Sequence, residues 1–221
     1  MGRIWPWREE DAGQFWAEAR GVLKGNGIIA VPTDTFYALA ANPFQEAALS
    51  RLFALKQRPP EKPVLLLVDG LPMLEQLAGQ VPHPARRLME RFWPGPLTII
   101  LPSLPHLPRL LTASTGNIGV RQPGHLITRR LITALGYPVT GTSANLSGRP
   151  PLTRAARVAE EFGEQVDLIL EAGDCPGGLP STIVDVSGSF PRLMRSGAVT
   201  TGKLAEVVPE IEPFSNMGEI R

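Results

Sequence analysis

Four cationic side chains occur in six short polar motifs, each of which ends or follows an apolar run. They are Lys56, Arg58, Arg121 and Arg195. The planar guanidinium of arginine can donate parallel hydrogen bonds to a phosphate or a carboxylate. The motifs therefore predict a site for a multiply charged anion. They read PTDTFY (32–37), KQR (56–58), GVRQP (119–123), GTSANLSG (141–148), STIVD (181–185) and MRSG (194–197).

The neutral members of these motifs are hydrogen-bonding groups that could hold a second substrate beside the anion. They are Thr33, Thr35, Ser143, Asn145, Ser181 and Thr182. The motifs contain no cluster of carboxylates for acid–base chemistry. A site of this composition suits a reaction that depends on positioning and charge neutralisation, such as transfer at phosphorus.

Each motif also has a structural interpretation when it is taken alone. A single arginine is most often a solvated surface residue, and PTDT can form a simple turn. Lys56 and Arg58 can decorate the C-terminal end of a helix, where cations are favourable. The functional interpretation therefore depends on the motifs occurring together.

Several familiar chemistries do not fit the sequence. It has neither a P-loop nor a dinucleotide-binding glycine pattern, and its three histidines form no H-E-x-x-H motif. No metal-ligating residues are therefore predicted. GTSAN resembles the start of a nucleophile elbow but has Asn145 in place of the second glycine, so Ser143 is interpreted as a hydroxyl ligand. The single cysteine, Cys175, is interpreted as an inert loop thiol.

The composition predicts a globular domain in the cytoplasm. The chain has 221 residues, 43% of them apolar and 19% charged, and a net charge of only +1. A net charge this small argues against non-specific electrostatic binding to nucleic acid or membrane. One cysteine fits a reducing compartment, and no apolar run approaches the roughly 18 residues needed to span a bilayer.

Apolar periodicity predicts helices and strands in rough alternation. We expect an α/β (α+β) fold with one twisted mixed β-sheet and flanking helices, formed by residues 1–202. Residues 203–221 lose the periodicity and are expected to be a C-terminal tail. Helices are expected within 11–27, 46–55, 71–93, 125–136 and 154–163. Strands are expected at 28–32, 64–68, 97–101, 117–121, from 138, and at 166–170, 182–186 and 192–194.

Taken together and in this order, the motifs resemble the YrdC-type family of threonylcarbamoyl-AMP synthases. K-x-R at 56–58 and S-x-N at 143–145 are the most specific, and the resemblance runs from about Gly27 to Gly197. It implies a concave positive groove in which L-threonine, bicarbonate or carbon dioxide, and ATP with Mg²⁺ give threonylcarbamoyl-AMP and pyrophosphate. The product would feed N6-threonylcarbamoyladenosine formation in tRNA through a separate threonylcarbamoyl transferase complex, and contact with tRNA is a further expectation.

The resemblance also implies roles for individual residues. Nucleotide and phosphate contacts fall on Lys56, Arg58, Ser143, Asn145 and Arg195, of which Lys56 and Arg58 are the expected catalytic pair. Threonine or carbamoyl contacts fall on Thr35, Tyr37, Arg121 and Ser181, with Arg121 on the amino-acid carboxylate.

One residue departs from the family pattern, and two rival functions stay open. Ala38 stands where the family usually has glycine, and we interpret that position as one that requires only a small side chain. We also expect the chain to lack the extra C-terminal domain that longer family members carry. The first rival is a non-catalytic module of the same fold that binds double-stranded RNA or tRNA. The second is an enzyme of the same fold that acts on another amine acceptor or carbamoyl donor, such as a carbamoyl-phosphate-dependent maturation factor.

Overall fold

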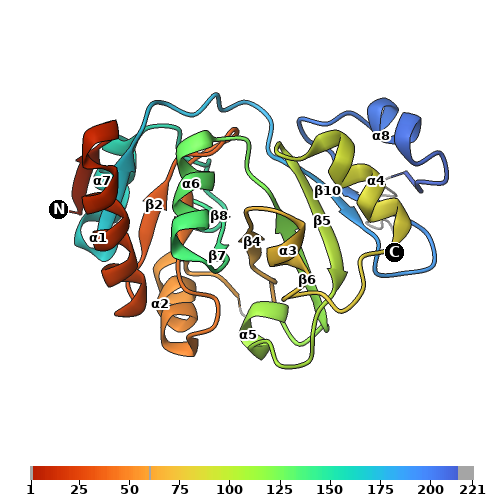
Figure 1. The fold of residues 1–221 in the computed structure, drawn as a ribbon, viewed down its shortest axis with the longest axis horizontal. Coiled ribbons are helices and arrows are strands. Elements are labelled where there is room, and N and C mark those ends of the chain that lie inside the picture. Colours follow the sequence, from red (N-terminus) through yellow and green to blue (C-terminus); the bar gives the residue numbers. More distant parts are fainter. Residues whose placement is uncertain (1, 60, 214–221) are drawn as a thin grey trace.

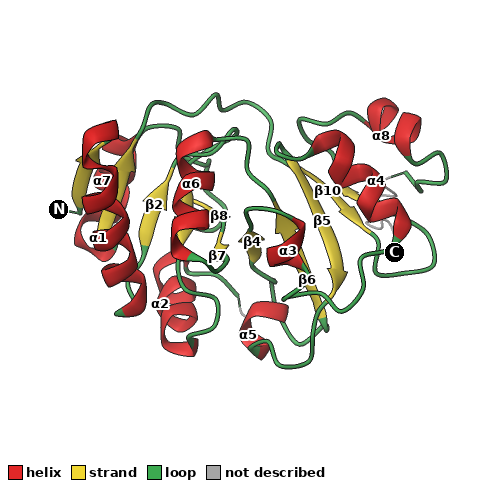
Figure 2. Cartoon of the chain, viewed as in Figure 1, coloured by secondary structure: helices red, strands yellow, loops and turns green. Residues whose placement is uncertain are grey.

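The computed structural model describes residues 2–59 and 61–213 of the chain, which fold into two β-sheets surrounded by helices (Figures 1 and 2). The helices are η1 (Glu9–Asp11), α1 (Ala12–Lys24), α2 (Glu46–Lys56), α3 (Leu71–Leu74), α4 (His83–Phe92), α5 (Arg109–Thr112), α6 (Leu126–Leu135), α7 (Ala155–Phe162), η2 (Gly163–Gln165) and α8 (Thr201–Val207). The strands are β1 (Arg3–Pro6), β2 (Ile29–Val31), β3 (Ala38–Ala40), β4 (Leu65–Leu67), β5 (Leu97–Pro102), β6 (Asn117–Arg121), β7 (Val139–Thr140), β8 (Thr142–Ser143), β9 (Leu168–Glu171), β10 (Thr182–Asp185) and β11 (Arg192–Arg195).

Both sheets contain parallel and antiparallel pairs. The first has the order β1-β9-β2-β3-β8 and the second β11-β10-β5-β6-β4-β7. In the first, β1, β9 and β2 are parallel while β3 and β8 are antiparallel to their neighbours. The predicted α/β class with mixed strand pairing is confirmed. The prediction of a single sheet was wrong, because the described strands form two sheets.

Helix α1 follows its apolar stripe. Phe15, Ala19 and Leu23 recur every four residues and are fully buried. Residues at this spacing share one face of a helix. That face packs toward β2, and α7 packs against β1 and β9. On the second sheet, α4 packs against β5 and also contacts α8.

Helix α2 ends so that two neighbouring cations point to different places. Lys56 is its last residue and is 2% exposed. Gln57 then adopts the left-handed conformation, with φ of 49°, and turns the chain. Arg58 follows this turn and lines a cavity. The end of helix α2 and the left-handed Gln57 therefore separate the K and R of K-x-R.

Gly141 lets the chain cross from one sheet to the other. It lies between β7 of the second sheet and β8 of the first. A Cβ atom at this position would lie 2.5 Å from Cγ of Leu67, which is closer than carbon atoms approach. Only glycine fits there without displacement of Leu67.

The chain after Gly202 does not begin as the aperiodic tail that the sequence predicts. Helix α8 runs through Val207, and Leu204 and Val208 are fully buried. Glu212 then pairs with Arg192 at the edge of β11. Residues 203–213 therefore pack on the rest of the fold, and the remainder of the expected tail, 214–221, lies outside the described residues.

None of the described helices combines the length and the apolar character that crossing a membrane requires.

Candidate active site

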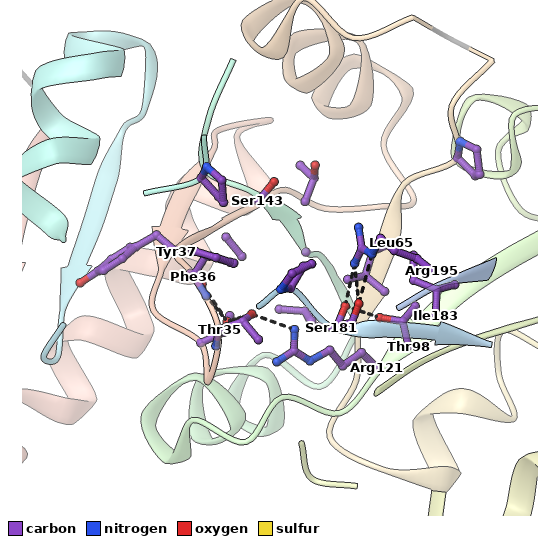
Figure 3. Close-up of a pocket in the computed structure, with 18 of the residues that line it drawn as sticks. Thr35, Phe36, Tyr37, Leu65, Thr98, Arg121, Ser143, Ser181, Ile183 and Arg195 are labelled. Atoms are coloured by element: carbon purple, nitrogen blue, oxygen red, sulfur yellow. Dashed lines mark hydrogen bonds between the residues drawn. The ribbon is translucent and has the colours of Figure 1, made fainter. Parts of the chain in front are cut away.

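Residues from both sheets line a cavity of about 440 Å³ (Figure 3). The first sheet and its turns contribute Thr33, residues 35–38 and residues 142–143, and the second contributes side chains from β4, β5, β6, β10 and β11. Seven of the nine predicted site residues line it: Thr35, Tyr37, Arg58, Arg121, Ser143, Ser181 and Arg195. The fold thus brings motifs from across the sequence into one place.

Lys56 lies behind the cavity wall. Its ammonium donates hydrogen bonds to the carbonyl oxygens of Ser143 and Asn145, the latter at 2.7 Å. The backbone N–H of Ser147 in turn donates to the carbonyl oxygen of Lys56 at 3.0 Å. Burial and the like charge of Arg58 lower the pKa of Lys56 to about 7. In this structure Lys56 therefore holds the loop of residues 143–147 in place.

Asn145 is the second predicted residue outside the cavity lining. Its Oδ1 accepts a hydrogen bond of 2.6 Å from the hydroxyl of Ser143, and its Nδ2 donates to the carbonyl oxygens of Leu146 and Arg149. The S-x-N motif is thus an internally bonded loop. Of its two polar side chains, Ser143 forms part of the cavity wall.

Arg58 lines the cavity from the segment after α2. Its Nε donates to the carbonyl oxygen of Lys62 at 3.2 Å and its Nη2 to that of Pro63 at 2.8 Å. Burial lowers the pKa of Arg58. Since guanidinium has five N–H groups, these two bonds leave donors for a ligand.

Arg121 is the most deeply buried cation of the cavity. Its side chain, at the end of β6, is 4% exposed. Nε donates to the carbonyl oxygen of Gly95 at 2.9 Å, and Nη1 donates to the hydroxyl of Thr35 at 3.2 Å. Nη2 forms an ion pair of 2.6 Å with Oδ1 of Asp34.

Arg195, Ser181 and Thr98 form a third polar group in the wall (Figure 3). Arg195 donates from Nη2 to the carbonyl oxygen of Ser181 at 2.8 Å and to its hydroxyl at 3.1 Å. That hydroxyl lies 2.9 Å from the hydroxyl of Thr98. The sequence did not single out Thr98, because one threonine in the apolar run LTIIL gives no local signal.

Tyr37 lines the cavity, but its ring does not point into it. The side chain is fully buried, and Figure 3 shows the ring directed away from the labelled polar residues. Its hydroxyl hydrogen is shared by the carbonyl oxygens of Leu170 and Gly173, at 3.1 and 3.3 Å. Burial raises the pKa of the Tyr37 phenol. The phenol therefore belongs to the core.

Ala38 fits its position without strain. It lies in β3, pairs with Val31 and Ser143, and is not among the described residues with positive φ. The requirement at this position is therefore small size, since an ordinary strand conformation needs no glycine.

The cavity is strongly electropositive. Three guanidiniums line it, and the described residues that line it include no aspartate or glutamate. Burial and the like charge of Arg121 both lower the pKa of Arg195. Cations that repel one another in a partly buried site are stabilised by an anionic ligand.

The protein groups around the cavity suit a metal ion whose ligands are mainly substrate oxygens and water. Among the described residues, no three histidine, cysteine or acidic side chains gather as a metal site. The cavity offers hydroxyl oxygens, from Thr35, Ser143 and Ser181. Mg²⁺ keeps several waters and takes phosphate oxygens readily. This donor set therefore fits Mg²⁺ held mainly by a bound triphosphate.

The two mixed sheets and the cationic cavity between their residues define an α/β protein with a site for an anionic ligand. Comparison with known proteins identifies its family. The model of the Sua5/YciO/YrdC family, described as "Telomere recombination", matches residues 21–197. The chain belongs to this family.

Two of the similar curated proteins are named threonylcarbamoyl-AMP synthase. The threonylcarbamoyl-AMP synthase of Pyrococcus abyssi is 37% identical over 193 residues, which are 87% of this chain and 57% of that protein. The threonylcarbamoyl-AMP synthase of Idiomarina loihiensis is 36% identical over 77% of this chain and 92% of its own length. The crystal structure of P. abyssi Sua5 complexed with L-threonine matches with a TM-score of 0.90 at 34% identity, covering 97% of this chain and 62% of that one. This chain thus spans less than two thirds of the P. abyssi protein.

Proposed function

We propose that this protein is an L-threonylcarbamoyladenylate synthase. It would form threonylcarbamoyl-AMP and pyrophosphate from L-threonine, bicarbonate or carbon dioxide, and ATP. The observation that carries the proposal is the convergence of Arg58, Arg121 and Arg195 on one cavity whose described lining contains no carboxylate. The threonine complex of P. abyssi Sua5 supports threonine as the amino acid.

The reaction needs two bond-forming steps. The neutral amine of threonine adds to carbon dioxide, forms an N–C bond and loses a proton to give a carbamate. A carbamate oxygen then attacks the α-phosphorus of ATP, and the bond from that phosphorus to the bridging oxygen of the β-phosphate breaks. Pyrophosphate leaves with the bond's electrons, and the carbamate has become a mixed anhydride with AMP.

The second step brings two anions together, the carbamate and ATP. The guanidiniums that line the cavity would offset their repulsion. Arg58 and Arg195 would face the phosphates, and Arg121 would take the threonine carboxylate. Preorganised donors of this kind each contribute roughly 10²–10³ in rate. Lys56 would act from behind the wall, by holding the loop that carries Ser143. Thr35 and Ser181 would supply hydroxyls on the threonine side, and Mg²⁺ would arrive on ATP.

The wider setting of the reaction is also part of the proposal. Threonylcarbamoyl-AMP is an activated carbamoyl donor, so a separate transferase complex would consume it to modify tRNA in the cytoplasm. Direct contact with tRNA is compatible with this role but is not needed for the synthase step.

One incubation tests the reaction and its specificity. The purified chain is given MgATP, labelled bicarbonate and one amino acid at a time. We expect label in an adenylate, with equal release of pyrophosphate, when threonine is present. Label with any other amino acid at the same rate would contradict the threonine assignment.

Two further arms test the rival functions. Salt-sensitive binding of double-stranded RNA or tRNA without turnover of ATP would indicate an RNA-binding module. Product formation from carbamoyl phosphate in place of bicarbonate would indicate the carbamoyl-phosphate-dependent enzyme.

A further inference from the structure

A carboxylate lies directly behind the deepest cation of the cavity. Asp34 belongs to the turn between β2 and β3, and its side chain is 21% exposed. Its Oδ1 accepts hydrogen bonds from Nη2 of Arg121 at 2.6 Å and from the backbone N–H of Gly124 at 2.7 Å. Asp34 itself is not among the residues that line the cavity.

Asp34 is the charged member of a three-point hold on Arg121. The guanidinium also donates to the carbonyl oxygen of Gly95 and the hydroxyl of Thr35. These acceptors come from two segments, the turn that holds Asp34 and Thr35 and the loop that holds Gly95, and together they fix both the plane and the direction of the group. Of its five N–H groups, the hydrogen bonds found within the described chain use three, which leaves one on each terminal nitrogen.

The charge of Asp34 also stabilises the protonated form of the buried Arg121. Burial lowers the pKa of Arg121, and the charge and hydrogen bond of Asp34 oppose that effect. A buried guanidinium with only neutral acceptors would be costly, since a buried charge needs a partner. Asp34 supplies this partner from outside the cavity, so the side of Arg121 that faces the cavity stays open to an anion.

The two oxygens of Asp34 are used unequally. Oδ1 accepts both hydrogen bonds, whereas Oδ2 is buried and has no hydrogen-bond partner within the described part of the chain. An asparagine could keep the Oδ1 acceptor as its amide oxygen and remove the charge, with its amide nitrogen in place of Oδ2. Asp34→Asn and Asp34→Ala therefore separate the hydrogen bonds from the charge.

We propose that Asp34 is a positioning residue that aims Arg121 at the carboxylate of the amino-acid substrate. The proposal rests on the proposed function, in which Arg121 binds that carboxylate. Asp34 acts through Oδ1: it holds Nη2 and, through Gly124, the loop that follows β6. Its effect is therefore specific to the amino acid and does not extend to the nucleotide.

Separate binding measurements test the proposal on the full chain. Isothermal titration calorimetry gives the Kd of L-threonine and the Kd of MgATP for wild type, Asp34→Ala and Asp34→Asn. We expect Asp34→Ala to weaken threonine binding about tenfold to 100-fold, the scale of hydrogen bonds to charged groups, with ATP binding within about twofold of wild type. We expect Asp34→Asn to keep threonine binding within about threefold, because both hydrogen bonds survive.

Glu9→Ala is the matched control. It removes an arginine–carboxylate pair of the same 2.6 Å length, with Arg130, that is exposed and does not line the cavity. Both of its Kd values should equal those of wild type. Thermal unfolding of every variant shows whether it is folded during the titration.

The outcomes separate the two hypotheses. If wild type binds MgATP but no threonine, the threonine assignment is overturned, and this inference with it. If wild type binds threonine and folded Asp34→Ala binds it equally well, only the positioning role is overturned. Equal losses in the Ala and Asn variants, with both folded, would also overturn aiming through Oδ1.

Discussion

The Lys56 ammonium donates a 2.7 Å hydrogen bond to the carbonyl oxygen of Asn145, 89 residues further along the chain. This bond joins the K-x-R motif at the end of α2 to the S-x-N loop after β8. The two motifs are therefore one structural unit. Arg58 and Ser143 line the cavity from it, while Lys56 and Asn145 support them from behind.

The buried ammonium predicts a pH-dependent stability. Lys56 has a pKa of about 7 in the folded chain against an ordinary value of 10.5. Between these values the unfolded chain keeps a proton that the folded chain has released. The free energy of unfolding should therefore rise with pH in this window, by at most about 1.4 kcal/mol per pH unit from this group.

Comparison with Lys56→Met isolates this contribution, because the other titrating groups are common to both proteins. Urea unfolding of wild type and variant is measured from about pH 7 to about pH 10. The stability of wild type minus that of the variant should increase with pH. A constant difference would contradict the lowered pKa.

Arg58→Ala should lower the rate of pyrophosphate release by roughly 10²–10³, because it removes a preorganised cation from the phosphate side of the cavity. Stability should change little, since the internal partners of Arg58 are two carbonyl oxygens in an exposed segment. Initial rates with saturating threonine measure the effect. Arg157→Ala, which removes an arginine from an exposed pair with Glu160, serves as the control and should keep the wild-type rate. A wild-type rate in Arg58→Ala would remove Arg58 from the mechanism.

Tyr37→Phe should affect stability and leave catalysis nearly intact. The Tyr37 hydroxyl donates within the core, to Leu170 and Gly173, and its loss should cost about 1 kcal/mol of unfolding free energy. Denaturant unfolding and kcat/KM for threonine are measured on the same preparation. A large fall in kcat/KM with unchanged stability would instead support the direct ligand contact that the family resemblance implies.

The hydroxyls of Thr98 and Ser181 should act as a pair. Ser181 accepts a hydrogen bond from Arg195 and lies 2.9 Å from Thr98, so Thr98→Val should disturb how the Ser181 hydroxyl is directed. A double-mutant cycle of Thr98→Val and Ser181→Ala on kcat/KM should give a coupling energy of about 0.5–3 kcal/mol. Strictly additive effects would mean that Thr98 only fills space in β5.

The sequence alone determined the residue types of the site and much of the local structure. The spacing of Phe15, Ala19 and Leu23 specifies the buried face of α1, because side-chain direction repeats with the helix turn. The cationic and hydroxyl motifs were also visible in sequence, and seven of the nine chosen residues line one cavity. Their roles in binding and catalysis stay predictions.

Only the tertiary structure decided which strands pair and where each polar side chain points. Periodicity gives the faces of a strand but not its neighbours, so it could not divide the strands into two sheets. Lys56 points at a loop 89 residues away and Tyr37 at the carbonyl oxygens of a distant strand and its turn. Such contacts depend on backbone groups that every residue carries, and these leave no mark in the sequence.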